Sequence, residues 1–486
     1  MSSEIRNLEP KALWNKFADL NEVPRPSKKE ERVIEFMMNF GKKLGLETIK
    51  DDTGNVIIKK PASKGYENRK TIVMQSHLDM VHQKNNDTNF DFSTQGIDMY
   101  VKDGWVRAKG TTLGADNGLG VATIMAILES KEIEHPAIEA LFTIDEETGM
   151  TGALGLKGGL LSGDFLLNLD TEEDDELTIG CAGGLDVTAK RNYKEESVPD
   201  NYKAFTITVK GLNGGHSGMD IHRGLGNANK MMNRLLYSSY EKFGVRVSEI
   251  NGGSLRNAIP RESVAVVVVP ADNSNKWKEE FEKRKSELKF EFKTTEKNLT
   301  IELAETSLPS KVMEAEAQKS LLKSIYTAHN GVYRMSADIP NLVETSNNVA
   351  RVLVKDGEIT ILCLTRSSVE SSKYDLADAL KSAFELCGCE VTFAGAYPGW
   401  TPNVESPLLE MMIKLYEKQN GQKPKVAACH AGLECGILGR NYPGMDMISF
   451  GPTIKGAHSP DERANIASAE KYWNYVLEIL KNIPKK

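Results

Sequence analysis

Residues 71–79 are TIVMQSHLD, an apolar run that is followed directly by His77, Leu78 and Asp79. A short apolar run bounded by polar residues is typical of a buried strand, so His77 and Asp79 lie at the carboxyl end of that strand. In open α/β sheets, ligands bind in the crevice outside the carboxyl ends of the strands. This stretch therefore predicts an α/β fold with a functional site beside His77.

Acidic and histidine residues follow other apolar runs in the same way. The runs and the residues that follow them are Ile138–Ile144 with Asp145-Glu146-Glu147, Phe165–Leu169 with Asp170, and Met445–Phe450 with His458. Asp116 stands instead at the expected start of a helix, where N–H groups and the helix dipole favour a carboxylate. Because the carboxyl ends of parallel strands share one edge of a sheet, we expect these side chains to converge.

The order of the expected elements predicts two domains. Apolar strands alternate with helices in the first and last parts of the chain, which is typical of an α/β layer structure with a mostly parallel sheet. Between these parts, β-rich segments lie among long amphipathic helices such as Gly226–Phe243 and Lys311–His329, which is an α+β pattern. We therefore expect an α/β domain in two parts, 1–185 and 399–486, with an α+β domain, 186–398, inserted between them.

The composition disfavours several classes of protein. The chain has 486 residues with 61 Lys+Arg and 68 Asp+Glu, a formal net charge of −7, which disfavours a general nucleic-acid or anionic-membrane binder. No apolar run approaches the roughly 20 residues that a membrane-spanning helix needs, and the polar N-terminus MSSEIRNLEPKALWNKF has no apolar signal core. We expect a cytoplasmic protein with neither a nucleic-acid nor a membrane partner.

Two short sequence patterns predict a helix start and the state of the cysteines. Ser27-Lys-Lys-Glu30 fits a capping box at the start of a helix that ends near Gly45. Cys387-Gly-Cys389 could bind a soft metal, but two ligands do not make a site, and the six cysteines include no CxxC pair. Reduced, mostly buried thiols in a cytosolic protein are the favoured interpretation.

Each candidate residue has a structural alternative when it is taken alone. The alternatives are a hydrogen-bonded surface pair for His77 and Asp79, a helix cap for Asp116, solvated carboxylates for Glu146 and Glu147, an acidic loop for Asp170, and a loop histidine for His458. If these residues had only structural roles, there would be little reason for carboxylate or imidazole groups to stand at the ends of so many strands and at the start of a helix. The joint pattern favours a metal site.

The same motifs resemble the M20 metallopeptidase family, and within it the branch of bacterial cytosolic dipeptidases. The motifs that carry the resemblance are His77-Leu-Asp79, Gly114-Ala-Asp116-Asn-Gly118, Asp145-Glu146-Glu147-Thr-Gly149, Asn168-Leu-Asp170 and Gly456-Ala-His458-Ser-Pro460. The resemblance extends over nearly the whole chain, including Gly214–Gly218 and His430–Gly436, and no ligand position departs from it. It implies a di-metal peptidase catalytic domain in which the inserted domain is a lid.

The resemblance implies a role for each metal-ligand position. Asp116 would bridge two divalent ions, of which one is completed by His77 and Asp170 and the other by Glu147 and His458. Two imidazoles and three carboxylates suit Zn²⁺ and would also accept Mn²⁺ or Co²⁺. The two ions would lower the pKa of a bridging water, which becomes the nucleophile near neutral pH.

Two further residues beside the ligands carry expected catalytic roles. Glu146 directly precedes Glu147 and is the candidate general base that takes the water proton and returns it to the leaving amine. Asp79 lies within reach of the His77 ring, where it would fix the imidazole tautomer and strengthen the ligand. A helix cap is the alternative for Asp79.

Substrate contacts are expected mainly from the inserted domain. His216, in a glycine-flanked turn, could reach across a cleft and stabilise the oxyanion, or it could only hold its own turn. Arg366, just beyond the expected strand Thr360–Leu364, suits bidentate capture of a C-terminal carboxylate. Asn257 could assist Arg366, and Glu434 could pair with the free ammonium of the substrate, although surface or structural roles fit these two equally well.

The resulting prediction is a di-metal dipeptidase that hydrolyses unblocked dipeptides, including Xaa-His dipeptides. An aminoacylase or a tripeptide exopeptidase on the same site is the alternative, because all three share the site chemistry. A non-catalytic metal- or peptide-binding module is disfavoured, because Glu146 and every proposed ligand are present. In this family lids often pair between subunits, so a homodimer through the lid is one option. An enlarged lid that mimics this pairing within one chain is the other.

Overall fold

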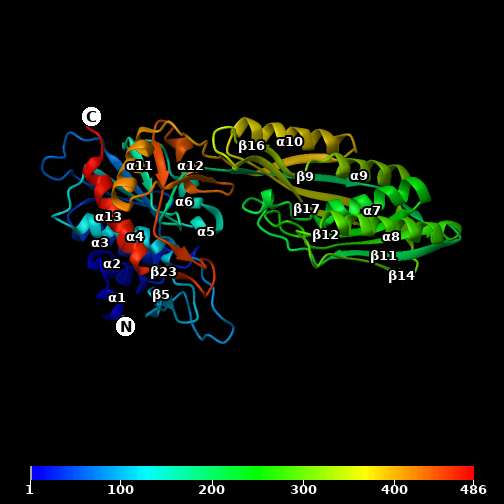
Figure 1. The fold of residues 1–486 in the computed structure, drawn as a ribbon, viewed down its shortest axis with the longest axis horizontal. Coiled ribbons are helices and arrows are strands. Elements are labelled where there is room, and N and C mark those ends of the chain that lie inside the picture. The colour runs from blue at the N-terminus through cyan, green and yellow to red at the C-terminus, as the bar shows by residue number, and fades with distance from the viewer. Residues whose placement is uncertain (1–2) are drawn as a thin grey trace. The chain divides into compact units, whose positions relative to one another are not determined.

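The computed structural model describes residues 3–486, which form two units (Figure 1). Unit 1 comprises the described residues up to Gly180 together with Pro402–Ala428 and Leu433–Lys486. Unit 2 comprises Cys181–Thr401 and Cys429–Gly432. The sequence pattern assigns 186–398 to the inserted domain, whereas unit 2 also includes a short segment from a later part of the chain.

Unit 1 is built on an eight-stranded sheet with the order β1-β2-β6-β3-β7-β21-β8-β20. Its strands are β1 (Glu47–Lys50), β2 (Val56–Lys60), β3 (Ile72–His77), β6 (Ile138–Thr143), β7 (Phe165–Asn168), β8 (Glu176–Cys181), β20 (Lys425–Cys429) and β21 (Asp446–Ser449). The central strands β6, β3, β7 and β21 are parallel, whereas β1, β2 and β8 pair in the antiparallel direction. The predicted α/β class is confirmed, with the parallel pairing at the centre of the sheet.

The helices of unit 1 include one that is buried along nearly its whole length. The helices are α1 (Ser3–Arg6), α2 (Lys11–Asn21), α3 (Glu31–Lys43), α4 (Ala115–Glu129), α5 (Glu146–Gly149), α6 (Thr151–Gly155), α11 (Pro407–Asn420), α12 (Glu434–Asn441) and α13 (Ile466–Asn482). Because α4 is apolar on all sides beyond its first turn, it belongs in the interior, where it packs against α2 and β3. This packing fixes Asp116, in the first turn of α4, close to the sheet.

A small second sheet in unit 1 has the order β22-β23-β5-β4. Its strands are β4 (Met99–Lys102), β5 (Trp105–Ala108), β22 (Ile454–Lys455) and β23 (Arg463–Asn465). The turn between β22 and β23 carries His458, and the pairing of β23 with β5 holds the hairpin in place. No helix within residues 3–486 is long and apolar enough to cross a membrane.

Unit 2 is an α+β structure with a large antiparallel sheet of order β14-β11-β13-β12-β17-β18-β9-β19, to which β16 is added beside β17. Its strands are β9 (Gly183–Asn192), β10 (Glu195–Ser197), β11 (Tyr202–Lys210), β12 (Arg246–Gly253), β13 (Ser263–Pro270), β14 (Thr300–Thr306), β15 (Lys311–Met313), β16 (Gly331–Met335), β17 (Val343–Lys355), β18 (Glu358–Ser367) and β19 (Glu390–Tyr397). The long helices are α7 (Ala228–Phe243), α8 (Ser274–Glu291), α9 (Ala315–Thr327) and α10 (Glu370–Glu385). They join the sheet in one core that includes Leu235, Trp277, Leu321 and Leu376.

Two local expectations are wrong, and tertiary contacts explain both. Ser27 does not cap a helix, because α3 begins only at Glu31 and the Ser27 hydroxyl donates to Asp79 Oδ2 at 2.8 Å. The pattern predicts a helix over Lys311–His329, but Lys311–Met313 form β15, which pairs with β10, and α9 begins after them. In both cases a segment far away in the sequence, Asp79 for Ser27 and β10 for Lys311–Met313, binds residues that the local pattern assigns to a helix.

Candidate metal centre

The five predicted metal ligands come together in unit 1. His77 is the last residue of β3, Asp170 follows the end of β7, and Glu147 lies in the first turn of α5. Asp116 lies in the first turn of α4, and His458 lies in the turn between β22 and β23. Because β3, β6 and β7 are parallel, the residues that follow them gather at one edge of the sheet.

The Asp116 carboxylate faces both histidines. Its Oδ1 lies 3.3 Å from His77 Nε2, and its Oδ2 lies 3.3 Å from His458 Nε2. His77 Nε2 is also 3.4 Å from Asp170 Oδ1, and His458 Nε2 is 3.1 Å from Glu147 Oε2. Two groups of ligand atoms therefore share Asp116, one with His77 and Asp170 and the other with Glu147 and His458.

The donors of both groups fit divalent cations. Within each group the ligand atoms lie within 4.8 Å of one another. Glu147 Oε1 is buried and has no hydrogen-bond partner among the described residues, so this oxygen is available to a cation. The donors are imidazole nitrogens and carboxylate oxygens, which Zn²⁺, Mn²⁺ and Co²⁺ all accept.

The acid–base properties of this cluster reflect the charges that it brings together. Burial opposes the charge of Asp116, but the His458 and His77 rings lower its pKa below the usual carboxyl range. The Asp116 and Glu147 carboxylates in turn raise the pKa of His458 to about 11. Burial raises the pKa of Glu147. Metal binding requires neutral imidazoles, so bound cations would replace the protons on these rings.

Asp79 is fully buried and orients two segments of the site. His77 Nδ1 lies 3.1 Å from the Asp79 carbonyl and 3.3 Å from Asp79 Oδ1, which leaves His77 Nε2 facing the other ligands. The Asp79 carboxylate also accepts the N–H groups of Glu146 at 3.0 Å and of Glu147 at 3.3 Å, and the hydroxyl of Ser27. Asp79 therefore holds the first turn of α5 as well as the His77 ring, a second contact that the sequence does not predict.

Glu146 lies beside the ligands. Its carboxylate is within 4.8 Å of ligand atoms of His77 and Glu147. Burial raises the pKa of Glu146 well above the usual carboxyl range; His77 opposes this shift, and the charges of Asp170, Glu434 and Glu147 add to it. A carboxyl whose pKa is raised is better suited to accept a proton and to return it.

Glu434, the predicted partner of a substrate ammonium, is fully buried at the start of α12. Its Oε2 accepts hydrogen bonds from Gln75 Nε2 and Thr143 Oγ1, each at 2.7 Å. Its Oε1 has no hydrogen-bond partner within residues 3–486, and burial raises the pKa of this carboxyl to about 7. Glu434 is thus bonded to the ends of β3 and β6 and is not exposed to solvent.

In unit 2, His216 and Arg366 form a pair of hydrogen-bond donors. The N–H groups of Gly218 and Met219 donate to His216 Nδ1 at 3.2 and 3.1 Å, so the ring proton is on Nε2. Arg366 Nη2 lies 3.5 Å from that Nε2, and Arg366 Nη1 donates to the Tyr397 hydroxyl at 2.7 Å. Burial and the charge of Arg366 lower the pKa of His216, which keeps the ring neutral. Two neighbouring donors of this kind suit an anionic group.

Other residues of unit 2 surround this pair. Asn257 is exposed, and its carbonyl accepts the N–H of Ser217 at 2.8 Å, which places it beside the His216 turn. Tyr397 and His430 lie in the same cluster; neither is a predicted site residue, although His430 begins the motif His430–Gly436. His430 Nε2 lies 2.7 Å from the hydroxyl of Ser346. No sequence pattern around Tyr397 indicates a role in this site.

The cysteines take no part in the candidate metal groups. Five of the six are buried, and Cys429 is half-buried. Cys387 Sγ lies 3.8 Å from Cys389 Sγ. None of the candidate metal-binding groups found within residues 3–486 includes a cysteine.

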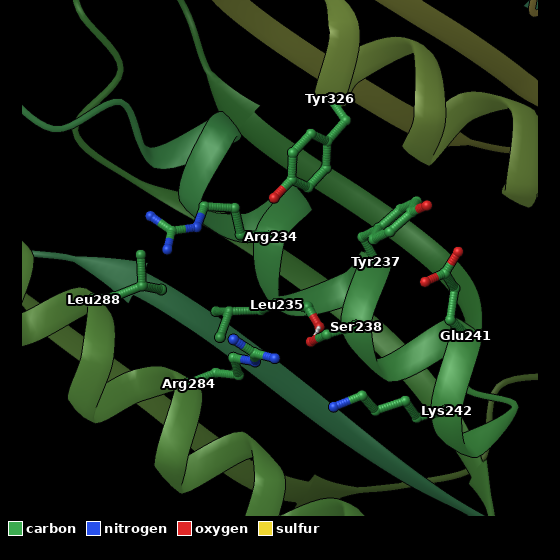
Figure 2. Close-up of a pocket in the computed structure, with 9 residues that line it drawn as sticks. All are labelled: Arg234, Leu235, Tyr237, Ser238, Glu241, Lys242, Arg284, Leu288 and Tyr326. Carbon is green, nitrogen blue, oxygen red and sulfur yellow. Dashed lines mark hydrogen bonds between the residues drawn. The ribbon is translucent and has the colours of Figure 1, made fainter.

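A cavity of about 210 Å³ in unit 2 lies among α7, α8 and α9, apart from the predicted site residues (Figure 2). Tyr237 and Tyr326 contact each other beside it, with ring centroids 5.1 Å apart. Its cationic side chains are all held in ion pairs, namely Arg234 with Glu291, Lys242 with Glu280, and Arg284 with Glu280 and Glu287. Because these charges are already paired, the cavity is not a candidate catalytic site.

Comparison with known proteins identifies the family. Residues 73–482 match the model of peptidase family M20/M25/M40. The chain belongs to this family. The predicted family membership is therefore confirmed, as is the prediction of an enzyme that hydrolyses peptide bonds.

Two relatives that match over the full chain are dipeptidases. The chain is 43% identical over 484 residues to the cytosol non-specific dipeptidase of Escherichia coli (strain K12), with 100% of both chains covered. It is 44% identical to the aminoacylhistidine dipeptidase from Vibrio alginolyticus, whose crystal structure matches with a TM-score of 0.95 over 100% of this chain and 99% of that chain. An aminopeptidase from Bacillus cereus, 17% identical with a TM-score of 0.58 over 98% and 99% of the two chains, shares the fold. The predicted dipeptidase branch is confirmed.

Proposed function

We propose that this chain is a dinuclear metallo-dipeptidase that hydrolyses unblocked dipeptides, including Xaa-His dipeptides. The observation that carries the proposal is the Asp116 carboxylate, whose two oxygens each lie 3.3 Å from the Nε2 of a different histidine. His77 and Asp170 would complete the site of one cation, and Glu147 and His458 that of the other. The names of the two dipeptidases that match over the full chain support the substrate class.

The residues around the cations would have distinct roles. When bound, the two cations would supply Lewis-acid activation of a water molecule and of the scissile carbonyl. Glu146 would accept the proton of the attacking water and return it to the leaving amine, a role that its raised pKa supports. Asp79 would keep His77 in the tautomer that presents Nε2 to the ligand group.

Unit 2 would be the lid domain and would contribute substrate contacts. The Nε2–H of His216 suits a developing oxyanion, and the guanidinium of Arg366 suits the carboxylate of a dipeptide. Asn257 would assist from the turn between β12 and β13, since its carbonyl accepts the N–H of Ser217 in the His216 turn. Glu434 would bind a substrate ammonium through Oε1, because its Oε2 is already bonded to two neighbours.

The same proposal covers the ion, the location and the assembly. Zn²⁺ is the proposed ion, with Mn²⁺ and Co²⁺ as the alternatives that the donor set accepts. A cytoplasmic location is supported by the name of the cytosol dipeptidase of Escherichia coli. A homodimer through unit 2 is a proposal that the particle mass measured by light scattering would test.

Metal removal followed by a substrate panel tests the function. The purified enzyme is stripped with a chelator, reconstituted with Zn²⁺, Mn²⁺ or Co²⁺ alone, and assayed with Ala-His, an N-acetyl amino acid and a tripeptide. We expect activity to disappear on chelation, to return with one of these ions, and to be highest on Ala-His. Preferred cleavage of the acetylated compound would support an aminoacylase instead, and preferred cleavage of the tripeptide would support an exopeptidase. Undiminished activity after chelation would contradict the metal site.

Arg366→Lys is expected to raise the KM for Ala-His by about 10- to 100-fold, because lysine keeps the charge but loses the paired donors that a carboxylate binds. The same variant should cleave a C-terminally amidated dipeptide as the wild-type enzyme does, since that substrate lacks the carboxylate. Arg234→Lys is the matched control, because Arg234 is an arginine of unit 2 that pairs with Glu291 beside the cavity apart from the predicted site residues. An unchanged KM for Ala-His would remove Arg366 from the substrate site.

A further inference from the structure

One buried carboxylate, that of Glu462, binds four consecutive N–H groups of the segment that carries Asp116. Its Oε2 accepts the N–H of Leu113 at 2.7 Å and that of Gly114 at 2.9 Å. Its Oε1 accepts the N–H of Ala115 at 2.8 Å and that of Asp116 at 3.2 Å. N–H groups at the start of a helix lack partners within the helix, so this one side chain fixes the start of α4.

Arg25 binds the same segment from its carbonyl side. Its Nη2 donates to the Gly114 carbonyl at 2.6 Å. Its Nη1 donates to the carbonyls of residues 78 and 79, each at 3.1 Å. Because residues 78 and 79 directly follow His77, Arg25 links the backbone beside His77 to the backbone beside Asp116.

The glycines of the Asp116 motif make room for Arg25. A Cβ at Gly114 would lie 2.6 Å from Arg25 Nη2, and so would a Cβ at Gly118. Gly114 also has a φ of +68°, a conformation that residues with a side chain rarely adopt. The close approach of the guanidinium, together with Met80 beside Gly114 and Phe17 beside Gly118, leaves no room for a side chain at either position.

Glu462 also belongs to the turn that carries His458. This turn joins β22 to β23, and β23 pairs with β5. A carboxylate that lies in the His458 turn and binds the Asp116 segment fixes the separation of these two segments. Burial lowers the pKa of Arg25 to about 10, so Arg25 stays cationic near neutral pH, and burial raises the pKa of Glu462 to about 7.

We infer that Glu462 and Arg25 are positioning residues of the two-cation site, which hold the Asp116 backbone so that each carboxylate oxygen faces one histidine. The inference rests on the proposed function, because it concerns the geometry of the same ions. A bridging carboxylate must point one oxygen at each of two cations. A small rotation of its backbone would therefore move both oxygens away from the histidines that they face. Both residues act through the backbone of the ligand segments, as partners that orient ligands do.

The metal affinity of the Glu462→Gln enzyme tests the inference. Glutamine has the same shape, but its amide nitrogen cannot accept the N–H groups that one carboxylate oxygen accepts. We expect the dissociation constants of both Zn²⁺ equivalents, measured by competition with a chelating indicator, to rise about 10- to 100-fold. Arg25→Lys, which keeps the charge but loses the paired donors, is expected to weaken both equivalents in the same direction. His458→Ala should weaken one equivalent only, because it removes a ligand from one group.

Glu139→Gln is the matched control. Glu139 is a buried carboxylate of unit 1 that accepts the N–H groups of Ser162 at 2.7 Å and Gly163 at 3.0 Å. We expect it to lower the melting temperature of the metal-free protein about as much as Glu462→Gln does, with unchanged Zn²⁺ affinity. Glu462→Asp, which is one methylene too short to reach all four N–H groups, is the second variant and should resemble Glu462→Gln.

Wild-type Zn²⁺ affinity in a folded Glu462→Gln or Glu462→Asp enzyme would overturn the inference. The inference would also be overturned if both Glu462 variants failed to fold while the Glu139→Gln enzyme folded. Glu462 would then be needed for the fold and not specifically for the geometry of the metal site. If the wild-type enzyme itself binds no pair of Zn²⁺ ions, the proposed function fails instead. The two failures are therefore distinguishable.

Discussion

Asp116→Asn is expected to abolish the binding of both cations and to lower kcat/KM for Ala-His by roughly 10⁴-fold, about 5 kcal/mol of transition-state stabilisation. Asparagine keeps the shape of aspartate, but it is uncharged and offers one oxygen in place of two. The two Asp116 oxygens face His77 and His458 at 3.3 Å each, so the substitution replaces one of these donor oxygens with an amide NH₂ and removes the negative charge that both ligand groups share. Inductively coupled plasma mass spectrometry of the purified variant measures its metal content per chain.

His458→Ala is the matched comparison for Asp116→Asn. It removes a donor only from the group that contains Glu147, so we expect this variant to keep one ion where Asp116→Asn keeps none. Circular dichroism of both variants shows whether they are folded before their metal contents are compared. Two ions bound to a folded Asp116→Asn enzyme would rule out Asp116 as the bridging ligand.

Glu146→Gln is expected to lower kcat by about 10³-fold while the metal content stays at two ions per chain. Glutamine can neither take the proton of the attacking water nor return it to the leaving amine. The Glu146 carboxylate lies within 4.8 Å of ligand atoms of His77 and Glu147, close enough to act on a water at the ions. The measurements are kcat for Ala-His and the metal content of the same preparation.

The pH dependence of Glu146→Gln adds a second readout. A protonated carboxyl cannot accept a proton, so wild-type activity should fall as the pH drops through the pKa of Glu146. Burial raises this pKa, which places the acid limb above the usual carboxyl range, and the variant should lack that limb. Glu410→Gln is the control, because Glu410 is exposed on α11 and pairs with Lys414. A Glu146→Gln enzyme that kept a tenth of the wild-type kcat would require a different base.

The candidate metal ligands could be proposed from the sequence because most of them follow the end of an apolar strand. β3 and β7 consist entirely of buried residues, and they end at or just before His77 and Asp170. Parallel strands end at a common edge, so the order of these strands is enough to bring the two side chains together. The same reasoning extends to Glu146 and Glu147 after β6.

Local patterns could not identify residues whose partners lie far along the chain. Ser27 fits a capping box, but its hydroxyl binds the Asp79 carboxylate, which only the folded chain brings near. Lys311–Met313 fit the helix that follows them, but β10 offers them a strand partner across more than a hundred residues. Hydrogen bonds between distant segments outweigh local propensity, which is a weak preference.

The sequence by itself determined the α/β class, the family and the side chains that gather at one edge of the sheet, because strand periodicity and strand ends are local properties. Only the tertiary structure decided how those side chains are held. Arg25 reaches the Gly114 carbonyl across 89 residues, and Glu462 reaches the Leu113 N–H across 349. The physical reason is that both residues bind backbone groups, and backbone groups are identical at every position until the fold brings particular ones within reach.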